Sequence, residues 1–178
     1  MKRTFSIGGV HPADNKISRG CAIETLPTPP TVYISVSQHI GAPAKPIVAV
    51  GDKVLTGQPV AEPGGFVSAY IHSSVSGTVK SIGPRKDLAG NMQTCIEIQV
   101  EGDEWVEGID RTDTLVTEFT DDNKTIMDKI KMGGVVGLGG ATFPTHVKLS
   151  PPPGKKCDML IINGCECEPY LTSDFRTL

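Results

Sequence analysis

Near the middle of this 178-residue chain lies the segment Val50-Gly51-Asp52-Lys53-Val54-Leu55-Thr56-Gly57-Gln58-Pro59-Val60-Ala61, followed by Ser74-Val75-Ser76-Gly77-Thr78-Val79. Both segments belong to a region, residues 31 to about 105, in which short β-branched runs alternate with turn residues. Closely spaced runs of this kind are typical of strands in a small all-β domain. The sequence therefore predicts a small sandwich or barrel for this region.

Individual strands and turns can be predicted within this region. The strands are expected at residues 32–36, 46–50, 67–71, 78–82 and 95–100. Turns are expected at Gly51-Asp52, Pro63-Gly64-Gly65 and Gly83-Pro84, because glycine and proline interrupt regular structure. The composition agrees, since 20 glycines and 14 prolines favour a turn-rich β fold over a helical bundle.

A glycine-rich segment follows in the C-terminal part of the chain, Gly133-Gly134-Val135-Val136-Gly137-Leu138-Gly139-Gly140-Ala141-Thr142-Phe143-Pro144-Thr145-His146-Val147-Lys148. A short helix is predicted before it, at residues 124–132, with Gly133 at the C′ position. A second helix is predicted from about Thr142 or Phe143. Bare backbone N–H groups, a helix start and the cation of Lys148 together suit an anion, most often a phosphate.

Two common nucleotide motifs do not fit this segment. A Rossmann fingerprint needs a preceding strand and a glycine at its sixth position, where Thr142 stands. A Walker A loop ends in Gly-Lys-Ser/Thr, which is absent. A flexible connector stays open as the alternative interpretation, because loops are where glycine collects.

A second polar cluster follows an apolar run. The run, Met159-Leu160-Ile161-Ile162, is predicted to be a buried strand of an α/β sheet. The cluster is Asn163-Gly164-Cys165-Glu166-Cys167-Glu168-Pro169, in which an extended backbone would place Glu166 and Glu168 on one face. Their carboxylates could accept hydrogen bonds from ribose hydroxyls or a nicotinamide amide. A surface turn is the alternative, because Asn-Gly is a hairpin signal.

Charge and composition set the predicted domain boundaries and argue against a nucleic-acid partner and a metal site. We expect an arm at residues 1–30, the β domain at 31–106, an acidic linker at 107–122, and the incomplete start of an α/β domain at 123–178. A net charge of −3 without a basic block argues against a nucleic-acid partner. The cysteine spacing matches no zinc or ferredoxin pattern, so no metal site is predicted. No catalytic side chain is assigned, and His39 is interpreted as structural.

The segments at 50–61 and 74–79 resemble the lipoyl and biotinyl carriers, whose fold is a barrel-sandwich hybrid. Those carriers present a modifiable lysine on a hairpin tip between the two segments. Here the tip is Pro63-Gly64-Gly65-Phe66, and no lysine occurs between Lys53 and Lys80. The resemblance implies the fold, whereas an acyl-carrier role is rejected because there is no amine to acylate.

The later motifs resemble a family of flavin enzymes. The glycine segment with Lys148, and residues 163–169, resemble the flavin-binding subunit of respiratory complex I. That family has a Gly-Arg-Gly-Gly-Ala-Gly-Phe-Pro-Thr loop and an Asn-Ala-Asp-Glu-x-Glu-Pro motif; Leu138 and Cys165 stand at its arginine and aspartate. Gly8-Gly9-Val10-His11-Pro12, residues 37–43 and residues 163–172 are more similar still to the RnfC family of the Rnf (Rsx) electron-transport complexes.

This resemblance implies an N-terminal portion of an NADH dehydrogenase subunit. It exchanges hydride between NAD(H) and FMN and passes electrons to [4Fe–4S] clusters in a further C-terminal part, coupled to ion transport. Expected partners are the other Rnf subunits, NADH and, indirectly, ferredoxin or a similar carrier, at the cytoplasmic side of the membrane. The residues implied at FMN are Gly137, Gly139, Gly140, Lys148 and Asn163; those implied on the NADH side are Phe143, Glu166 and Glu168.

Two further expectations concern activity. This length of chain alone is expected to bind FMN poorly and to lack NADH dehydrogenase activity. The rival hypothesis is a non-catalytic docking module, a barrel-sandwich domain whose arm and acidic linker hold a partner protein.

Overall fold

The computed structural model describes residues 12–87, 89–118, 120–138, 140–163, 166 and 168–173. The chain forms two compact units. One is continuous, Thr28–Lys155, and contains all the strands and helices of the described residues; the other combines Met1–Pro27 with Lys156–Leu178. Each unit is described by itself below.

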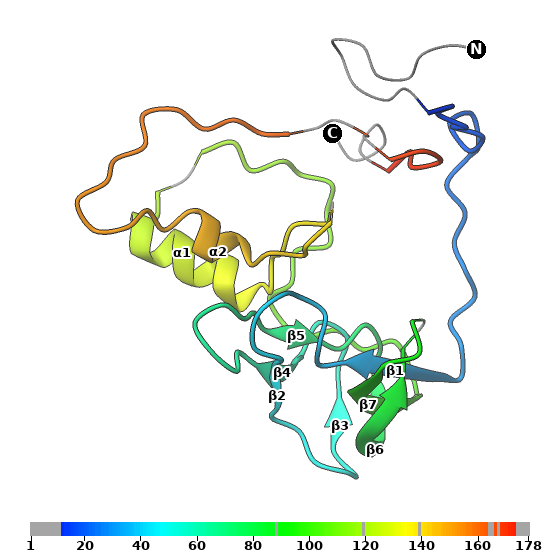
Figure 1. Cartoon of the computed structure of the whole chain (residues 1–178). Helices are drawn as coiled ribbons and strands as arrows, with labels where there is room; N and C mark the ends of the chain where they lie inside the picture. Colours follow the sequence, from blue (N-terminus) through cyan, green and yellow to red (C-terminus); the bar gives the residue numbers. More distant parts are fainter. Residues whose placement is uncertain are drawn as a thin grey trace. The chain divides into compact units, whose positions relative to one another are not determined.

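Two antiparallel sheets make the β domain of the continuous unit, and Figure 1 shows their strands. The 4-stranded sheet has the order β1-β7-β6-β3, and the 3-stranded sheet has the order β2-β4-β5. The strands are β1 (Thr31–Ser35), β2 (Lys45–Pro46), β3 (Lys53–Val54), β4 (Pro59–Glu62), β5 (Ile71–His72), β6 (Gly77–Lys86) and β7 (Met92–Val100). This arrangement confirms the predicted barrel-sandwich domain.

A core of small branched side chains holds the domain together. Ile96 and Ile98 of β7, Val79 of β6 and Val60 of β4 are completely buried. In β6 and β7 these side chains alternate with less buried residues, as the two-residue period of a half-buried strand requires. In β4 the register is irregular, and Val60 is followed by the equally buried Ala61. Burying each such side chain contributes about 1.5 to 3 kcal/mol. The β domain therefore has a complete core of its own.

The strand β6 continues through Gly83-Pro84, so the turn predicted there is wrong. Pro84 pairs with Thr94 of β7. The strand on the other side, β3, pairs with β6 only at Gly77 and Thr78. Proline lacks an N–H, and a sheet tolerates it where no neighbouring strand needs that donor. In the described structure the outer side of β6 at Pro84 is such a position.

The turn between β6 and β7 lies instead at residues 87–91 and is built by one aspartate. The carboxylate of Asp87 accepts hydrogen bonds from the backbone N–H groups of Ala89 and Asn91, at 2.9 and 2.8 Å. These bonds, that from Asn91 first, hold the pKa of Asp87 below its usual range. Aspartate is favoured in turns because it can replace a backbone acceptor in this way.

Of the strand predicted at residues 67–71 only Ile71 lies in a strand, β5, and a crossing loop contacts the residues before it. The N–H of Ala42 donates to the carbonyl of Val67 at 3.0 Å. Gly41 has φ of +96°, and a Cβ there would lie 2.2 Å from the same carbonyl oxygen. Only glycine permits this approach. Of the strand predicted at 46–50 only Pro46 lies in a strand, β2, and β3 and β4 are not among the predicted strands.

Helix α1 (Asn123–Met132) agrees with the predicted helix within one residue. Asp122 caps it, accepting a hydrogen bond from Thr125 N–H at 2.8 Å. The left-handed residue that ends it is Gly134, with φ of +65°, rather than Gly133 as predicted. Gly134 also meets the barrel, because a Cβ there would lie 2.4 Å from the carbonyl oxygen of Tyr70.

Helix α2 (Thr145–Lys148) begins later than predicted and is a single turn. Backbone bonding instead ties Phe143 and Pro144 to the start of the glycine-rich segment: Val136 forms an isolated bridge with Pro144, and Gly137 N–H donates to the Phe143 carbonyl. One turn carries little of a helix macrodipole, so the helix-end part of the phosphate argument gains no support. Helices α1 and α2 pack together (Figure 1).

The apolar run Met159-Leu160-Ile161-Ile162 is not the buried strand that was predicted. Each of these side chains is 73 to 81% exposed, and the backbone has no regular structure. A strand exists only through hydrogen bonds to a neighbouring strand. None of the residues that the structure describes pairs with this run.

No described helix has the length and apolar character needed to cross a membrane.

Candidate cofactor-binding site

The glycine-rich loop connects α1 to α2 and is closed at its base by backbone hydrogen bonds. Gly137 N–H donates to the Phe143 carbonyl at 3.0 Å, and Thr145 N–H donates to the Val135 carbonyl at 2.9 Å. Pro144 is fully buried between them. At the tip, by contrast, Leu138 is 89% exposed. The loop therefore has a fixed base and a tip that faces solvent.

The tip presents backbone amides that are available to a ligand. The N–H groups of Leu138, Gly140, Ala141 and Thr142 donate no hydrogen bond to another described residue. Gly140 and Thr142 have positive φ angles of +129° and +48°. Successive amides turned by such angles form concave sites that bind anions. Gly139, predicted at the same site, lies outside the described residues.

The side chain of Lys148 lies against the base of this loop. A Cβ at position 137 would come 2.7 Å from its Nζ atom, so glycine leaves the space that the ammonium uses. A cation and several amides are thus brought to one loop, as the sequence predicted. This donor set fits an anionic group such as the phosphate of a flavin nucleotide.

Two histidines near the loop were not singled out by the sequence. His146 of α2 has an Nδ1 atom that is buried without a partner in the described structure. Burial, and then the charge of Lys131, lower the pKa of His146. Burial also lowers the pKa of His72, which hydrogen-bonds the backbone of Met132 at the end of α1. Both rings therefore favour the neutral form at pH 7.

The second polar cluster belongs to the other compact unit. Gly164, Cys165 and Cys167 lie outside the described residues. The ammonium of Lys16 donates to the carbonyls of Glu168 and Glu166, at 2.7 and 3.2 Å. Tyr170 N–H donates to the Asp14 carbonyl at 2.8 Å. The N-terminal arm thus makes direct contacts with this cluster, which the sequence does not predict.

The tip between β4 and β5, where carriers present their lysine, is tied to the barrel. Ala69 N–H donates to Nε2 of His39 at 3.1 Å, and Nδ1 of His39 lies 3.1 Å from the Ile40 carbonyl. Both ring nitrogens are therefore used, with the proton on Nδ1. Gly64 N–H also donates to the hydroxyl of Ser68 at 3.0 Å. These bonds give His39 the structural role that the sequence suggested.

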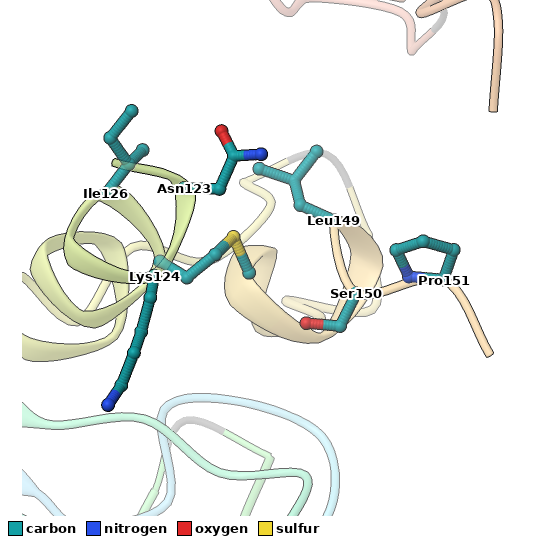
Figure 2. Close-up of a pocket in the computed structure, with 7 residues that line it drawn as sticks. Asn123, Lys124, Ile126, Leu149, Ser150 and Pro151 are labelled. Atoms are coloured by element: carbon teal, nitrogen blue, oxygen red, sulfur yellow. The ribbon is translucent and has the colours of Figure 1, made fainter. Parts of the chain in front are cut away.

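An open groove of about 540 Å³ lies between the start of α1 and the end of α2. Its lining consists of Asn123, Lys124, Ile126, Met127, Leu149, Ser150 and Pro151. Figure 2 shows that these side chains come from the first turns of α1 on one side and from the residues after α2 on the other. No predicted site residue lines it. Across the described ranges, no group of 3 or more His, Cys, Asp and Glu could hold a metal ion.

Comparison with known families identifies both halves of the chain. Residues 4–103 match the RnfC barrel sandwich hybrid domain. The chain belongs to the RnfC family. Residues 130–178 match the Nuo51 FMN-binding domain, and this range contains every predicted site residue.

Similar proteins with known names are consistent with membership of the RnfC family. The chain is 49% identical over 180 residues to the C subunit of the proton-translocating ferredoxin:NAD(+) oxidoreductase complex of Clostridium ljungdahlii, covering 100% of this chain and 38% of that protein. It is 44% identical to the C subunit of the Na(+)-translocating ferredoxin:NAD(+) oxidoreductase complex of Acetobacterium woodii, covering 96% of this chain and 38% of that protein. It is 40% identical to the C subunit of the ion-translocating oxidoreductase complex of Rhodobacter capsulatus, covering 99% of this chain and 34% of that protein.

Proposed function

We propose that this RnfC-family chain is part of the NADH dehydrogenase subunit of an ion-translocating electron-transport complex. The subunit takes hydride from NADH, or gives it to NAD⁺, through FMN and passes electrons on to iron–sulfur clusters. One observation carries the proposal: a loop of available amides, with Lys148 at its base, lies in the range that matches an FMN-binding domain. The relatives' names supply the ferredoxin:NAD⁺ reaction and its coupling to ion movement.

The residues are assigned by cofactor, either to FMN or to NADH. On the FMN side we place Gly137, Gly139, Gly140, Lys148 and Asn163. The loop amides and the ammonium bind the phosphate by charge-assisted hydrogen bonds, which are stronger than neutral ones. On the NADH side, Phe143 stacks against the adenine, and Glu166 and Glu168 orient the nucleotide by accepting hydrogen bonds. FMN itself supplies the exchange between two-electron and one-electron chemistry.

The remaining assignments concern the assembly. The partners proposed are the other subunits of the complex, NADH, and indirectly ferredoxin or a similar carrier. The [4Fe–4S] clusters are assigned to a part of the subunit outside these 178 residues, and the subunit to the cytoplasmic face of the membrane as a peripheral component. We retain the boundaries 1–30, 31–106, 107–122 and 123–178 for the arm, barrel, acidic linker and start of the flavin domain.

The direct test is NADH oxidation by the intact complex with Lys148→Met in this subunit. Loss of a charged hydrogen-bond donor at FMN should lower the activity about tenfold or more, and excess FMN should restore part of it. Lys155→Met, at an exposed lysine after α2, is the matched control and should leave the activity unchanged.

Two results would contradict the proposal. An unchanged rate in Lys148→Met would remove this lysine from the flavin site. An intact wild-type complex that oxidises no NADH would reject the dehydrogenase function and favour a docking module.

A further inference from the structure

The N-terminal arm and the polar cluster meet at several points, although about 150 positions separate them. Besides the bonds from Lys16 to the carbonyls of Glu166 and Glu168, the hydroxyls of Ser18 and Thr172 lie 2.8 Å apart. Together with the bond between Tyr170 and Asp14, these contacts run along both segments. They make the arm and the cluster one compact unit.

Lys16 is the central contact of this unit. It is half-buried, whereas the other described residues from 12 to 30 are all exposed. Its ammonium reaches the carbonyls of residues 166 and 168, which are two positions apart. One cation therefore binds the backbone at both glutamates.

The family matches make this contact unexpected. Lys16 lies in the range that matches the barrel domain, residues 4–103. Its partners Glu166 and Glu168 lie in the range that matches the FMN-binding domain, residues 130–178. A sequence division into two domains would therefore place the whole arm with the barrel, whereas Asp14, Lys16 and Ser18 of the arm contact the flavin segment.

We infer that the arm is a structural part of the flavin domain and that Lys16 is a positioning residue for the NADH side of the site. By holding the carbonyls of Glu166 and Glu168, Lys16 sets where the carboxylates of these two residues point. This inference rests on the proposed function, which assigns those two glutamates to NADH. It adds a residue that touches neither nucleotide and acts through the glutamates.

The test compares Lys16→Met, Lys16→Arg and Lys156→Met in the full-length subunit within the intact complex. Lys16→Met should raise the KM for NADH about tenfold, as expected for loss of hydrogen bonds from a charged group, with a smaller change in kcat. FMN content should stay unchanged. Lys16→Arg should bring KM back to within about twofold of wild type, because guanidinium can also donate to two carbonyls. Lys156 is an exposed lysine of the same unit, and its variant should behave as wild type.

The outcomes separate this inference from the proposed function. A wild-type complex without NADH oxidation rejects the proposed function. An active wild type whose KM is unchanged in Lys16→Met rejects only the role of Lys16. Loss of FMN together with NADH activity in Lys16→Met also rejects it, because Lys16 would then serve folding or flavin binding rather than the NADH side.

A second variant tests the docking of the arm independently of catalysis. Ser18→Cys with Thr172→Cys places two thiols where the hydroxyls now lie 2.8 Å apart. Mild oxidation of the intact complex should join them in a disulfide, detectable by peptide mapping, with NADH oxidation retained. Absence of this disulfide, or its formation with loss of activity, would overturn the docked arrangement.

Discussion

Isoleucine side chains have opposite environments in the barrel and in the apolar run at residues 159–162, before the polar cluster. Ile96 and Ile98 in β7 are completely buried, whereas Ile161 and Ile162 are 81 and 75% exposed. The difference lies in their neighbours, since β7 is paired on both sides, with β1 and β6. Among the described residues, nothing pairs with residues 159–162. An isoleucine thus stabilises this fold only where a paired strand places it over other apolar side chains.

The largest expected effect comes from truncating one isoleucine in each region. Ile96→Ala should lower the free energy of unfolding by about 2 to 5 kcal/mol, because it removes buried methyl groups and leaves a cavity. Ile161→Ala should change it by less than about 0.5 kcal/mol, as for most exposed positions. Urea denaturation of each variant measures both values. Equal losses would show that residues 159–162 are as well packed as the barrel.

A smaller effect is expected where α1 ends against the barrel. Gly134→Ala should cost about 1 to 3 kcal/mol beyond the cost of its left-handed backbone, because the new methyl group collides with the Tyr70 carbonyl. Gly51→Ala is the matched control, with a positive φ of +95° but nothing within 4 Å of its Cβ position. It should cost only the strain, about 1 kcal/mol.

Thermal or urea unfolding of the two glycine variants measures the difference between their stabilities. If they were equally stable, the close contact between the end of α1 and Tyr70 would be absent in solution. The glycine-rich loop would then lack its support on the barrel.

The smallest effect concerns α1 alone and depends on pH. Hydrogen bonding from the Thr125 N–H holds the pKa of Asp122 below its ordinary value of 3.8. A carboxylate with a depressed folded-state pKa contributes stability above its unfolded pKa and loses it as pH falls through the folded one. Helical circular dichroism should therefore fall as pH drops below about 4.

Asp122→Ala should weaken the helical signal at neutral pH and reduce its response to acid. Asp128→Ala, at an exposed position within α1, serves as the control and should keep both. A wild-type acid response that persists unchanged in Asp122→Ala would mean that this cap does not stabilise the helix.

The sequence was most informative where structure depends on local pattern. The β-branched run at 95–100 predicted the strand that carries Ile96 and Ile98, and the helix predicted at 124–132 agrees with α1 within one residue. It failed where a distant partner decides the outcome. Pro84 is in a strand because β3 ends before reaching it, and Val67 leaves its strand because Ala42 crosses it.

The same distinction applies to the candidate site. Lys148 and the glycines are near neighbours in sequence, so their spacing predicted that the lysine would lie close to the loop. The bond between Lys16 and Glu168 joins residues 152 positions apart, and no local pattern predicts it. The predicted strand at 159–162 needed a neighbouring strand that local hydrophobicity cannot supply.

The most direct test of the flavin assignment is the FMN content of the purified full-length subunit with Gly137→Ala. A methyl group at this position would lie 2.7 Å from Nζ of Lys148 and displace the ammonium from the loop. The wild-type subunit should retain FMN, and Gly137→Ala should lose most of it while keeping its unfolding midpoint close to wild type. A wild-type subunit without FMN, or a variant with an equal FMN content, would contradict the assignment of this loop.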